Sequence, residues 1–518
     1  MAISYKKVRF CAVIYAVIPI IIFYIGWLSP LAATALTILT AAGVLFFLKN
    51  NVKDDDDVIR IDVKSLVIAA IIALAWCFLA GQGAFIHQSN DNVIRNAIMR
   101  DLIRLPWPVI YSGDQMLSYY IAHWMVPAAF GKGVMLITGS VDAGFLVGRI
   151  VLFIWSTIGI YIAFILLSVV TAQKGRGRII LPSLIFIFFS GLDIVGTTIM
   201  NNYMFHLEWW TDFAQFSSFS TCLFWVYNQF IVSLIITLCI IKENSIKNFA
   251  FLGILAFPFG PFPFVGIVLI CVLKAIVIAV GKLREKKLGS ALKDIFSLQN
   301  IIMIIAVGVP FSLYYMSSKI ISNDFSVNGE HINTGFRLLD VFSRLTSFSD
   351  IMSFIGKYLL FIFLEAGIYL IIIFAYHKSK RILNVPFILS SVTLLFIPLF
   401  QIGTSFDFSM RVSIPALIYI AVEFIKMLST EIPIGTSGKE LIKLIRNNYL
   451  LVAALAIFFF GTFTPLTEYN REILNTISLG AEKPTDDNYL YSLEEHPYKL
   501  NFTSQNYSYS IFCKYLMK

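Results

Sequence analysis

Charged side chains are scarce in this chain. Only 14% of its 518 residues are Asp, Glu, Lys or Arg, whereas 58% are hydrophobic. Soluble domains carry about 25% charged residues, because their surfaces face water. The composition therefore excludes an ordinary soluble protein and indicates that lipid is the main solvent of the chain.

Several motifs of soluble enzymes are absent as well. The sequence has no P-loop, no G-x-S-x-G and no H-E-x-x-H, which argues against nucleotide-driven work. Five of the six cysteines fall in apolar runs, and only Cys513 lies in a polar segment. This arrangement excludes a disulfide framework and a cysteine-rich zinc site. We find no internal repeat and no low-complexity tract.

Apolar runs long enough to cross a bilayer recur along the sequence. Because a membrane-spanning helix needs about 17 to 25 such residues, the runs predict an all-α polytopic membrane protein with about 13 transmembrane helices. They lie near 9–28, 31–48, 65–82, 144–172, 179–195, 219–241, 247–258, 262–281, 299–317, 354–376, 383–401, 412–428 and 448–466. We assign residues 1–466 to the membrane domain and residues 467–518 to a polar tail on its outer face.

Basic residues gather in short segments between these runs. The segments are "KKVR" (6–9), "KGRGR" (174–178), "KLREKK" (282–287) and "HKSKR" (377–381). Membrane proteins keep such segments in the cytoplasm, so the net charge of +9 does not indicate a nucleic-acid partner. The apolar segment 116–139 is predicted not to span, because one more crossing would separate the later basic segments from the first.

The same rule places the remaining long loops on the opposite face. They are residues 83–143, 196–218, 318–353, 402–411 and the tail from 467. In a bacterium this is the periplasmic or outer face of the inner (plasma) membrane. Near this face, "FPFGPFPF" (257–264) is predicted to form a tight hairpin between two short apolar arms.

The loop 83–143 begins with a charged amphipathic segment. Each charge would cost about 2.5 to 3.5 kcal/mol at the bilayer centre, so the segment cannot span. One helical stripe holds Ile94, Ile98, Leu102 and Leu105, and the opposite stripe holds Asn92, Asn96, Arg100 and Arg104. The pattern is typical of an interfacial helix whose polar side faces water.

Asp91 opens this segment and is the candidate catalytic residue. Ser89, Asn90 and Asp91 are all good N-cap residues, so helix capping is one interpretation. The other makes Asp91 a general base that takes a proton from an acceptor hydroxyl, which contributes about 10²- to 10⁴-fold in rate. The roles are compatible, since a helix N-terminus favours the ionised carboxylate.

Acidic and aromatic residues lie side by side in "NNYMFHLEWWTDF" (201–213). The candidate binding residues are His206, Glu208, Trp209, Trp210 and Asp212. The two tryptophans suit an interfacial belt, but aromatic faces beside carboxylates also suit a sugar ring. Metal ligation by His206 is a weaker interpretation, because a lone histidine is not a metal site.

Three further charged residues lie in or beside apolar segments, where burying a charge costs free energy. Asp407 and Arg411 lie four residues apart in "GTSFDFSMRVSIP" (403–415), the spacing of a helical ion pair. Alternatively, Arg411 binds a lipid phosphate while Asp407 orients its guanidinium, a role for which Arg95 and Arg149 compete. Glu365 lies inside an apolar span, where an acid is either functional or a hydrogen-bonded structural group.

The layout of span, acidic outer loop and many further spans resembles the GT-C superfamily of integral membrane glycosyltransferases. Similar segments are "GQGAFIHQSNDNVIRNAIMRDLIRLPWPV" (81–109), "FHLEWW" (205–210), "WVYNQ" (225–229) and "FDFSMR" (406–411), which look like those of bacterial O-antigen and surface-polysaccharide modifiers. The resemblance implies a sugar donor on polyprenyl phosphate and a first-loop acid, here Asp91, as the base. Two additional spans lie ahead of the span that leads into that loop, unlike the simpler layout. The lack of a large soluble C-terminal domain argues against the oligosaccharyltransferase branch.

The expected activity is inverting transfer of one sugar from a polyprenyl-phosphate carrier to a cell-envelope glycan or lipid. Arg411 or Arg95 would offset the charge of the leaving phosphate, and the sequence leaves open whether a divalent cation shares that task. The expected partners are the donor, the acceptor and membrane lipids. An O-antigen-type polymerase and a lipid-linked glycan flippase or transporter are the alternatives, the latter disfavoured by the lack of a repeat.

Overall fold

The computed structural model describes most of the chain. Its described residues are 1–50, 58–173, 175–203, 206–286, 288–318, 325–327, 330–332, 336–339, 342, 345–402, 406–433, 435–487, 489–497 and 499–518. Parts of the predicted loops 196–218, 318–353 and 402–411 lie outside these residues, including residues 204, 205 and 403–405 of the candidate segments.

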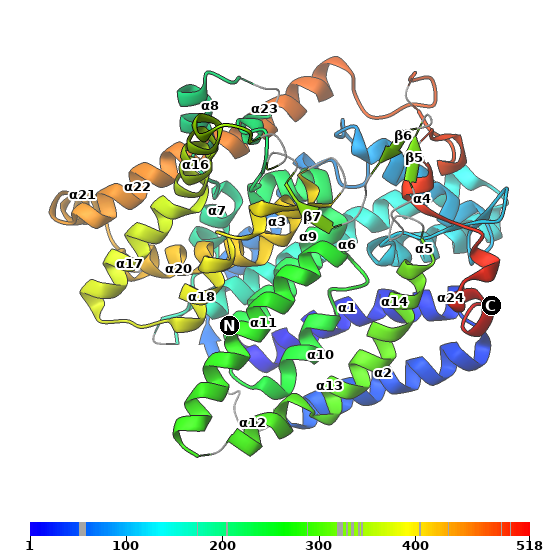
Figure 1. Cartoon of the computed structure of the whole chain (residues 1–518), viewed down its shortest axis with the longest axis horizontal. Helices are drawn as coiled ribbons and strands as arrows, with labels where there is room; N and C mark the ends of the chain where they lie inside the picture. Colours follow the sequence, from blue (N-terminus) through cyan, green and yellow to red (C-terminus); the bar gives the residue numbers. More distant parts are fainter. Residues whose placement is uncertain are drawn as a thin grey trace.

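Helices make up most of the fold (Figure 1). The first helices along the chain are α1 (Tyr5–Trp27), α2 (Pro30–Asn50), α3 (Val63–Leu79), α4 (Asp91–Arg104), α5 (Ala122–Thr138), α6 (Val141–Val170), α7 (Ile180–Phe188), α8 (Asp193–Met200), α9 (Phe219–Lys242) and α10 (Phe249–Ile254). They are followed by α11 (Pro261–Arg284), α12 (Leu288–Ile295), α13 (Leu298–Met303), α14 (Val309–Met316), α16 (Phe348–Ile362), α17 (Ile368–Lys380), α18 (Val385–Thr393), α19 (Asp407–Val412), α20 (Ile414–Glu431), α21 (Gly438–Asn447), α22 (Tyr449–Gly461), α23 (Phe463–Ser478) and α24 (Ile511–Tyr515).

Short helical turns of other kinds join these elements. The π-turns η3 (Ile304–Gly308) and η5 (Phe363–Gly367) connect α13 to α14 and α16 to α17. The 3₁₀ turns are η1 (Leu207–Trp209), η2 (Ile246–Asn248), η6 (Ile397–Leu399), η7 (Leu493–Glu495), η8 (Lys499–Asn501) and η9 (Tyr507–Tyr509).

Nine helical segments among the described residues are long and apolar enough to cross a membrane. They are Tyr5–Trp27, Pro30–Lys49, Val141–Val170, Ile180–Met200, Phe219–Lys242, Pro261–Arg284, Gly289–Met316, Phe348–Lys380 and Tyr449–Ser478. The chain is therefore a mostly helical, multi-pass membrane protein, as predicted.

The predicted count of about 13 spans is wrong. The predicted spans 65–82, 247–258 and 383–401 correspond to the shorter apolar segments Val63–Leu79, Ile246–Phe259 and Val385–Leu399. The predicted span 412–428 is α20, which has 18 residues but includes the charged Glu423, Lys426 and Glu431. Hydropathy overcounts here because apolar residues continue beyond the helix ends into turns, where they add hydrophobicity but no membrane-crossing length.

The hairpin predicted at 257–264 is confirmed. Helix α10 ends at Ile254, the chain turns, and α11 begins at Pro261 directly after Gly260. Proline suits the first position of a helix, because its missing N–H has no helical partner there and its φ angle is already helical. The two helices pack against each other.

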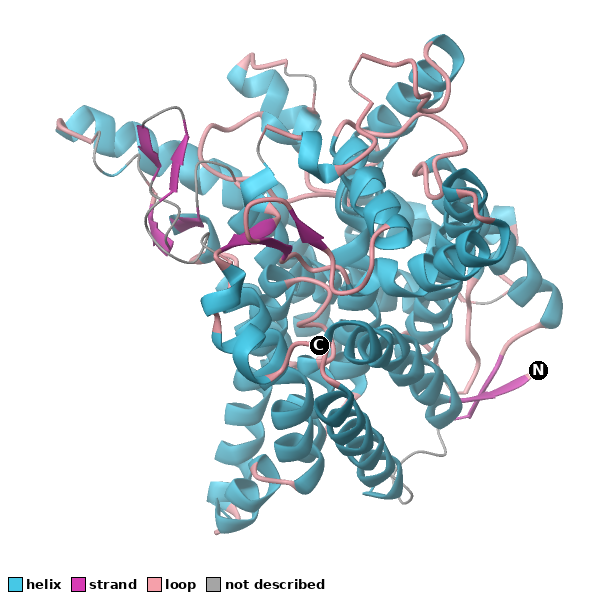
Figure 2. Ribbon diagram, turned by 90° about the vertical axis from the view of Figure 1, so that its right-hand side faces the viewer, coloured by secondary structure: helices cyan, strands magenta, loops and turns pink. Residues whose placement is uncertain are grey.

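Strands are few and small beside the helices (Figure 2). All pairs are antiparallel: β1 (Ala2–Ser4) with β2 (Val58–Arg60), β3 (Ile110–Tyr111) with β4 (Gln115–Leu117), β4 with β9 (Thr503–Gln505), β5 (Phe325–Val327) with β6 (Glu330–Ile332), and β7 (Phe336–Leu338) with β8 (Phe400–Ile402). In the three-stranded sheet, Met116 lies opposite Ser504. The end of the chain thus completes a sheet that begins in the first long loop.

A series of contacts connects three of the four basic segments at one end of the helical body. Strand β1 pairs with β2, whose Arg60 donates its N–H to the carbonyl of Gly175. Arg9 forms an ion pair of 3.1 Å with Glu243. At the same end, Gln173 donates to Thr430, and Lys380 pairs with Glu431. These contacts link the segments 6–9, 174–178 and 377–381 through the fold, and the side of the membrane on which they lie stays a prediction.

The helix predicted at the start of the loop 83–143 is confirmed as α4, but the prediction that its polar stripe faces water is wrong. Asn92, Asn96 and Arg100 are each at most 3% exposed. The C-terminal tail covers Asn96 and Arg100, which bind the Glu482 carboxylate at 3.1 and 2.7 Å, and Arg100 also donates to the carbonyl of Leu490. Asn92 instead donates to the carbonyl of Phe224 on α9. A helical periodicity shows which face is polar, but not whether a distant polar segment covers that face.

Helix α9 lies at the centre of the molecule, with almost all of its side chains buried. It packs against α6, α11 and α20. Its backbone departs from helical geometry at Val226, where φ is −139° and ψ is 35°. The residues on either side of this kink, Trp225 and Tyr227, contact the two groups of polar residues described next.

Candidate active site

Asp91 is the first residue of α4, and its side chain is 51% exposed. Its Oδ2 atom lies 3.2 Å from Nη2 of Arg95, one helical turn further along. Asn90 takes the N-cap position, and no side chain makes a capping hydrogen bond there. Asp91 is therefore not the cap residue of this helix, although its charge suits the first turn.

Asp407 and Arg411 form the predicted ion pair, with 2.9 Å between Oδ1 and Nη2. Both lie on the short helix α19, and only Asp407 is accessible, at 42% against 9% for the Arg411 side chain. Arg411 also donates to the hydroxyl of Tyr120 at 3.2 Å, and that hydroxyl is hydrogen-bonded to Tyr119. Because its Nη atoms already have partners, Arg411 is less free to clamp a phosphate than the sequence suggested.

The two ion pairs meet around the adjacent tyrosines. The charges of both Arg95 and Arg411 act on Tyr119, and the charge of Asp91 acts on Arg411. We call this group, whose members come from α4, α19 and the segment before α5, the Asp91–Arg411 cluster: Asp91, Arg95, Tyr119, Tyr120, Asp407 and Arg411.

In the Asp91–Arg411 cluster, the negative charges are exposed and the positive charges are buried. Its two carboxylates are about half exposed, whereas Arg95 and Arg411 are buried beneath them. Burial lowers the pKa of Arg411, but the charges of Asp407, the tyrosines and Asp91 outweigh it and raise that pKa overall, so the cation persists at any physiological pH. The cluster can accept a proton at its surface while fixed positive charge lies behind it.

Glu208 organises a second group of polar residues. Its carboxylate, only 3% exposed, accepts hydrogen bonds from Ser217 (2.7 Å), Gln215 (2.8 Å), Thr221 (2.6 Å) and the backbone N–H of Ser218 (2.8 Å). These donors lie at the N-terminus of α9, where N–H groups lack helical partners. Glu208 therefore fixes the start of the central helix.

The pKa of Glu208 is unusual for a carboxyl group. Burial, together with the nearby charges of Asp193 and Glu468, raises it to about 8, although the hydrogen bonds from Thr221 and Ser217 lower it. Glu208 therefore exchanges its proton near neutral pH, as a group suited to acid–base work does.

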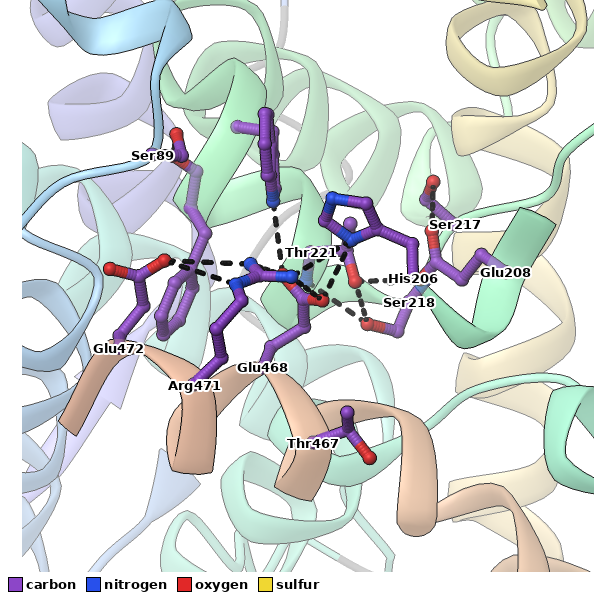
Figure 3. A network of polar contacts seen from close by, with 12 residues as sticks. Ser89, His206, Glu208, Ser217, Ser218, Thr221, Thr467, Glu468, Arg471 and Glu472 are labelled. Carbon is purple, nitrogen blue, oxygen red and sulfur yellow. Dashed lines mark hydrogen bonds and ion pairs between the residues drawn. The ribbon is translucent and has the colours of Figure 1, made fainter. Parts of the chain in front are cut away.

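Helix α23 adds two acidic residues, Glu468 and Glu472, to this group (Figure 3). Glu468 binds His206 at 3.0 Å, and Arg471 contacts both Glu468 and Glu472. At the far end, Glu472 binds His87 at 2.7 Å. We call the residues His87, His206, Glu208, Glu468, Arg471 and Glu472 the Glu208–Glu472 network.

The aromatic candidates divide between surface and core. Trp209 is 39% exposed, and its ring centre lies 4.5 Å from that of His206. Trp210 is buried and donates its indole N–H to Glu365 at 2.8 Å. The pair is therefore not an interfacial belt, and only Trp209 offers a face to a ligand. Asp212 is exposed on the turn that follows.

The two groups are neighbours across the start of α9. The N–H of Gln215 points to the hydroxyl of Ser409 on α19 at 3.4 Å. From the other side, the side chain of Asn92 on α4 donates to the carbonyl of Phe224 at 3.3 Å. Candidate residues from the segments 91–95, 206–212 and 407–411 thus lie at one region of the molecule.

Metal chemistry finds little support at this region. Within the ranges that the structure describes, no group of three or more His, Cys, Asp or Glu side chains could hold a metal ion. His206 faces Glu468 and Arg471 instead.

Several residues of these groups were not predicted. Tyr119 and Tyr120 lie in an apolar segment whose composition gives no sign of a site, and Glu468, Arg471 and Glu472 follow the last predicted span. The spacing of three and four residues between the latter places them on one helical face, which is a usable signal.

No family model, no curated protein and no solved structure matches the chain.

Proposed function

We propose that this protein is a multi-pass inverting glycosyltransferase of the GT-C type. It transfers a sugar from a polyprenyl-phosphate carrier to a cell-envelope glycan or lipid at the periplasmic or outer face. One observation carries the proposal: Asp91 is an accessible carboxylate that shares a cluster with two buried arginines from distant parts of the sequence. Such a division of charge suits a reaction that needs both a base and a positive potential.

In the proposed reaction, Asp91 takes the proton of the acceptor hydroxyl. The oxygen attacks the anomeric carbon from the face opposite the phosphate, and the bond between that carbon and the phosphate oxygen breaks. The carrier leaves as a lipid phosphate, whose low basicity makes an acid unnecessary. Arg95 and Arg411 stabilise the charge that develops on it, mainly through their field because their side chains are buried.

Trp209 and the Glu208–Glu472 network are assigned to sugar recognition. The exposed indole face of Trp209 suits the C–H surface of a sugar ring. Asp212, which is exposed two residues after the buried Trp210, is assigned to accept a hydrogen bond from a hydroxyl group at the edge of the sugar ring. This assignment makes the turn 206–212 a determinant of which acceptor or donor sugar is used.

The test is a transfer assay with purified protein in lipid. Radiolabelled polyprenyl-phosphate-glucose is incubated with host envelope glycan, and transfer by the wild-type protein is compared with transfer by Asp91→Asn. Asparagine has nearly the same size as aspartate but cannot act as the base. We expect a loss of at least about a hundredfold in the variant. Lys483→Ala, which alters an exposed side chain of the tail, is the control. An unimpaired Asp91→Asn variant removes this residue from the mechanism.

The donor also distinguishes the proposal from an O-antigen-type polymerase. A polymerase uses oligosaccharides linked to the carrier through diphosphate, so transfer from that donor but not from the monophosphate would favour it. A lipid-linked glycan transporter is the second candidate, and the acids Asp193 and Glu365 inside the membrane-spanning part favour it. Movement of a labelled carrier across protein-containing vesicles, without sugar transfer, would support that candidate.

A further inference from the structure

Two acidic side chains meet inside the membrane-spanning part of the molecule. Asp193 is the first residue of α8, and Glu365 lies in the π-turn η5 that interrupts the helix 348–380. They are only 1% and 2% exposed. A π-turn within a long helix often marks a functional position, because it breaks the regular hydrogen bonding.

Each carboxyl group has donors for one of its two oxygens. Oδ2 of Asp193 accepts from Ser190 at 2.9 Å and from Thr464 at 2.7 Å. Oε1 of Glu365 accepts from the indole N–H of Trp210 at 2.8 Å. These contacts connect α8 with α23, and η5 with the turn that carries Trp210.

The other two oxygens have no donor among the described residues. They are Oδ1 of Asp193 and Oε2 of Glu365. The residues beside them are joined, since the N–H of Leu192 donates to the carbonyl of Leu364 at 3.0 Å, and the two carboxyl groups act on each other as hydrogen-bond partners. Ionised carboxylates are acceptors only, so a hydrogen bond between them requires a proton. The missing partner of the pair is therefore a proton.

No basic side chain offsets the charge of this pair within the described structure. The other ionisable groups that act on it are Glu208, from η1, and Tyr369, from α17. Three other buried acids do have cations: Glu243 pairs with Arg9, Glu423 with Lys426, and Glu468 with Arg471. Two negative charges without a cation are very costly in a buried, apolar setting.

We propose that Asp193 and Glu365 form a proton-binding site in which one shared proton joins α8 to the π-turn η5. This inference does not depend on the proposed glycosyl transfer. The site lies beside a cavity of about 10 Å³, room for about one water molecule, lined by Glu365, Ser190, Gly191 and Ser217. Ser217 also binds Glu208, so the cavity lies between the shared proton and the titrating carboxyl group of Glu208.

Gly191 keeps this arrangement possible. A Cβ atom at this position would lie 2.1 Å from Oε2 of Glu365. Any other residue would force the Glu365 side chain or the backbone beside it to shift. The backbone is therefore fitted to the paired acids.

The test is reaction of the purified, lipid-embedded protein with dicyclohexylcarbodiimide, a hydrophobic reagent that adds to protonated carboxyl groups and gives an N-acylurea. Peptide mass spectrometry locates the adduct. We expect labelling of Glu365 or Asp193 near pH 6, and a labelled fraction that falls about tenfold per pH unit once the pair ionises. Glu423 and Glu468 are internal controls and stay unlabelled, because their cations keep them ionised.

Infrared spectroscopy provides a measurement that does not require the reagent to enter. Glu208→Gln serves as the background, because Glu208 is itself protonated near neutral pH. In this background at neutral pH we expect the C=O stretch of a protonated carboxyl group, and adding Glu365→Gln or Asp193→Asn removes it. The double variant, in which the two amides can hydrogen-bond to each other, replaces either single variant that does not fold. If the band is missing in the Glu208→Gln background, or survives these further substitutions, the proposal is overturned. Its failure leaves the Asp91→Asn assay unaffected, so the two proposals fail separately.

Discussion

Arg411 donates a hydrogen bond of 3.2 Å to the hydroxyl of Tyr120. The first of these residues belongs to α19, late in the chain, and the second precedes α5 in the loop 83–143. This contact brings the ion pair of α19 to the same place as Asp91. Because α4 and α19 are far apart in sequence, the cluster depends on tertiary contacts such as this hydrogen bond.

Tyr120→Phe tests this contact. The substitution removes the only group on Tyr120 that can accept from Arg411, and hydrogen bonds to charged groups contribute about 1.5 to 3 kcal/mol. We expect the KM for the lipid-phosphate donor to rise about tenfold or more. Tyr203→Phe, at an exposed tyrosine, is the control and leaves transfer unchanged. Equal kinetics for the two variants would show that the Tyr120 hydroxyl is not needed.

Arg100→Ala tests whether the tail is held by α4. The substitution leaves the Glu482 carboxylate without its cation in a mostly buried place, and breaking one partner of such a pair costs about 3 to 5 kcal/mol. We expect a lower melting temperature and earlier proteolytic cleavage between residues 479 and 505. Lys439→Ala, on the exposed side of α21, is the control and changes neither measurement.

Glu208 makes stability depend on pH. Its pKa of about 8 lies above the ordinary value of 4.5, so the folded protein holds this proton more tightly than the unfolded chain. The contribution of Glu208 is complete below about pH 4.5, declines as the pH rises toward 8, and changes no further above it. Melting temperatures across this range measure the decline.

Glu208→Gln is the matched variant for that measurement. It lowers stability at every pH, because an amide cannot accept all four donors, but it removes the part of the pH dependence that belongs to Glu208. The difference between wild type and variant should therefore shrink as the pH rises from 5 to 8. A constant difference would mean that Glu208 is already ionised throughout.

Two glycines of α11 give opposite predictions. A Cβ atom on Gly266 would lie 2.2 Å from the carbonyl oxygen of Val412 at the end of α19, whereas one on Gly281 meets nothing within 4 Å. Gly266→Ala should displace α19, lower stability by about 1 to 3 kcal/mol and reduce transfer through Arg411. Gly281→Ala should stabilise the helix by about 0.5 to 1 kcal/mol. Denaturant unfolding in detergent and the transfer assay test both.

Much of the helical layout was predictable from local sequence. The predicted spans 9–28 and 219–241 closely match Tyr5–Trp27 and Phe219–Lys242, because long uncharged runs leave the backbone no alternative to a helix in lipid. The break near 257–264 followed from its prolines and glycine. Short apolar segments were overcounted, since composition does not reveal where a helix stops.

Individual residues of the candidate site could be predicted from the sequence, but the contacts between them could not. Asp91, Asp407 and Arg411 drew attention because charge is rare in this chain, and the 407–411 pair followed from its spacing. The contact with Tyr120 and the cover over Arg100 depend on tertiary packing. Asp193 was overlooked although it lies in a predicted span, where an acid is as informative as Glu365.

The strand β9 has a consequence for biosynthesis. It supplies the third strand beside β4, although most of the chain separates the two. At about 5 to 20 residues per second, the edge of β4 stays unpaired on the order of tens of seconds after it leaves the ribosome. An open strand edge can pair with another chain, so a nascent or shortened protein is exposed to misassembly there. The region that carries Asp91 is thus among the first to be translated and among the last to mature.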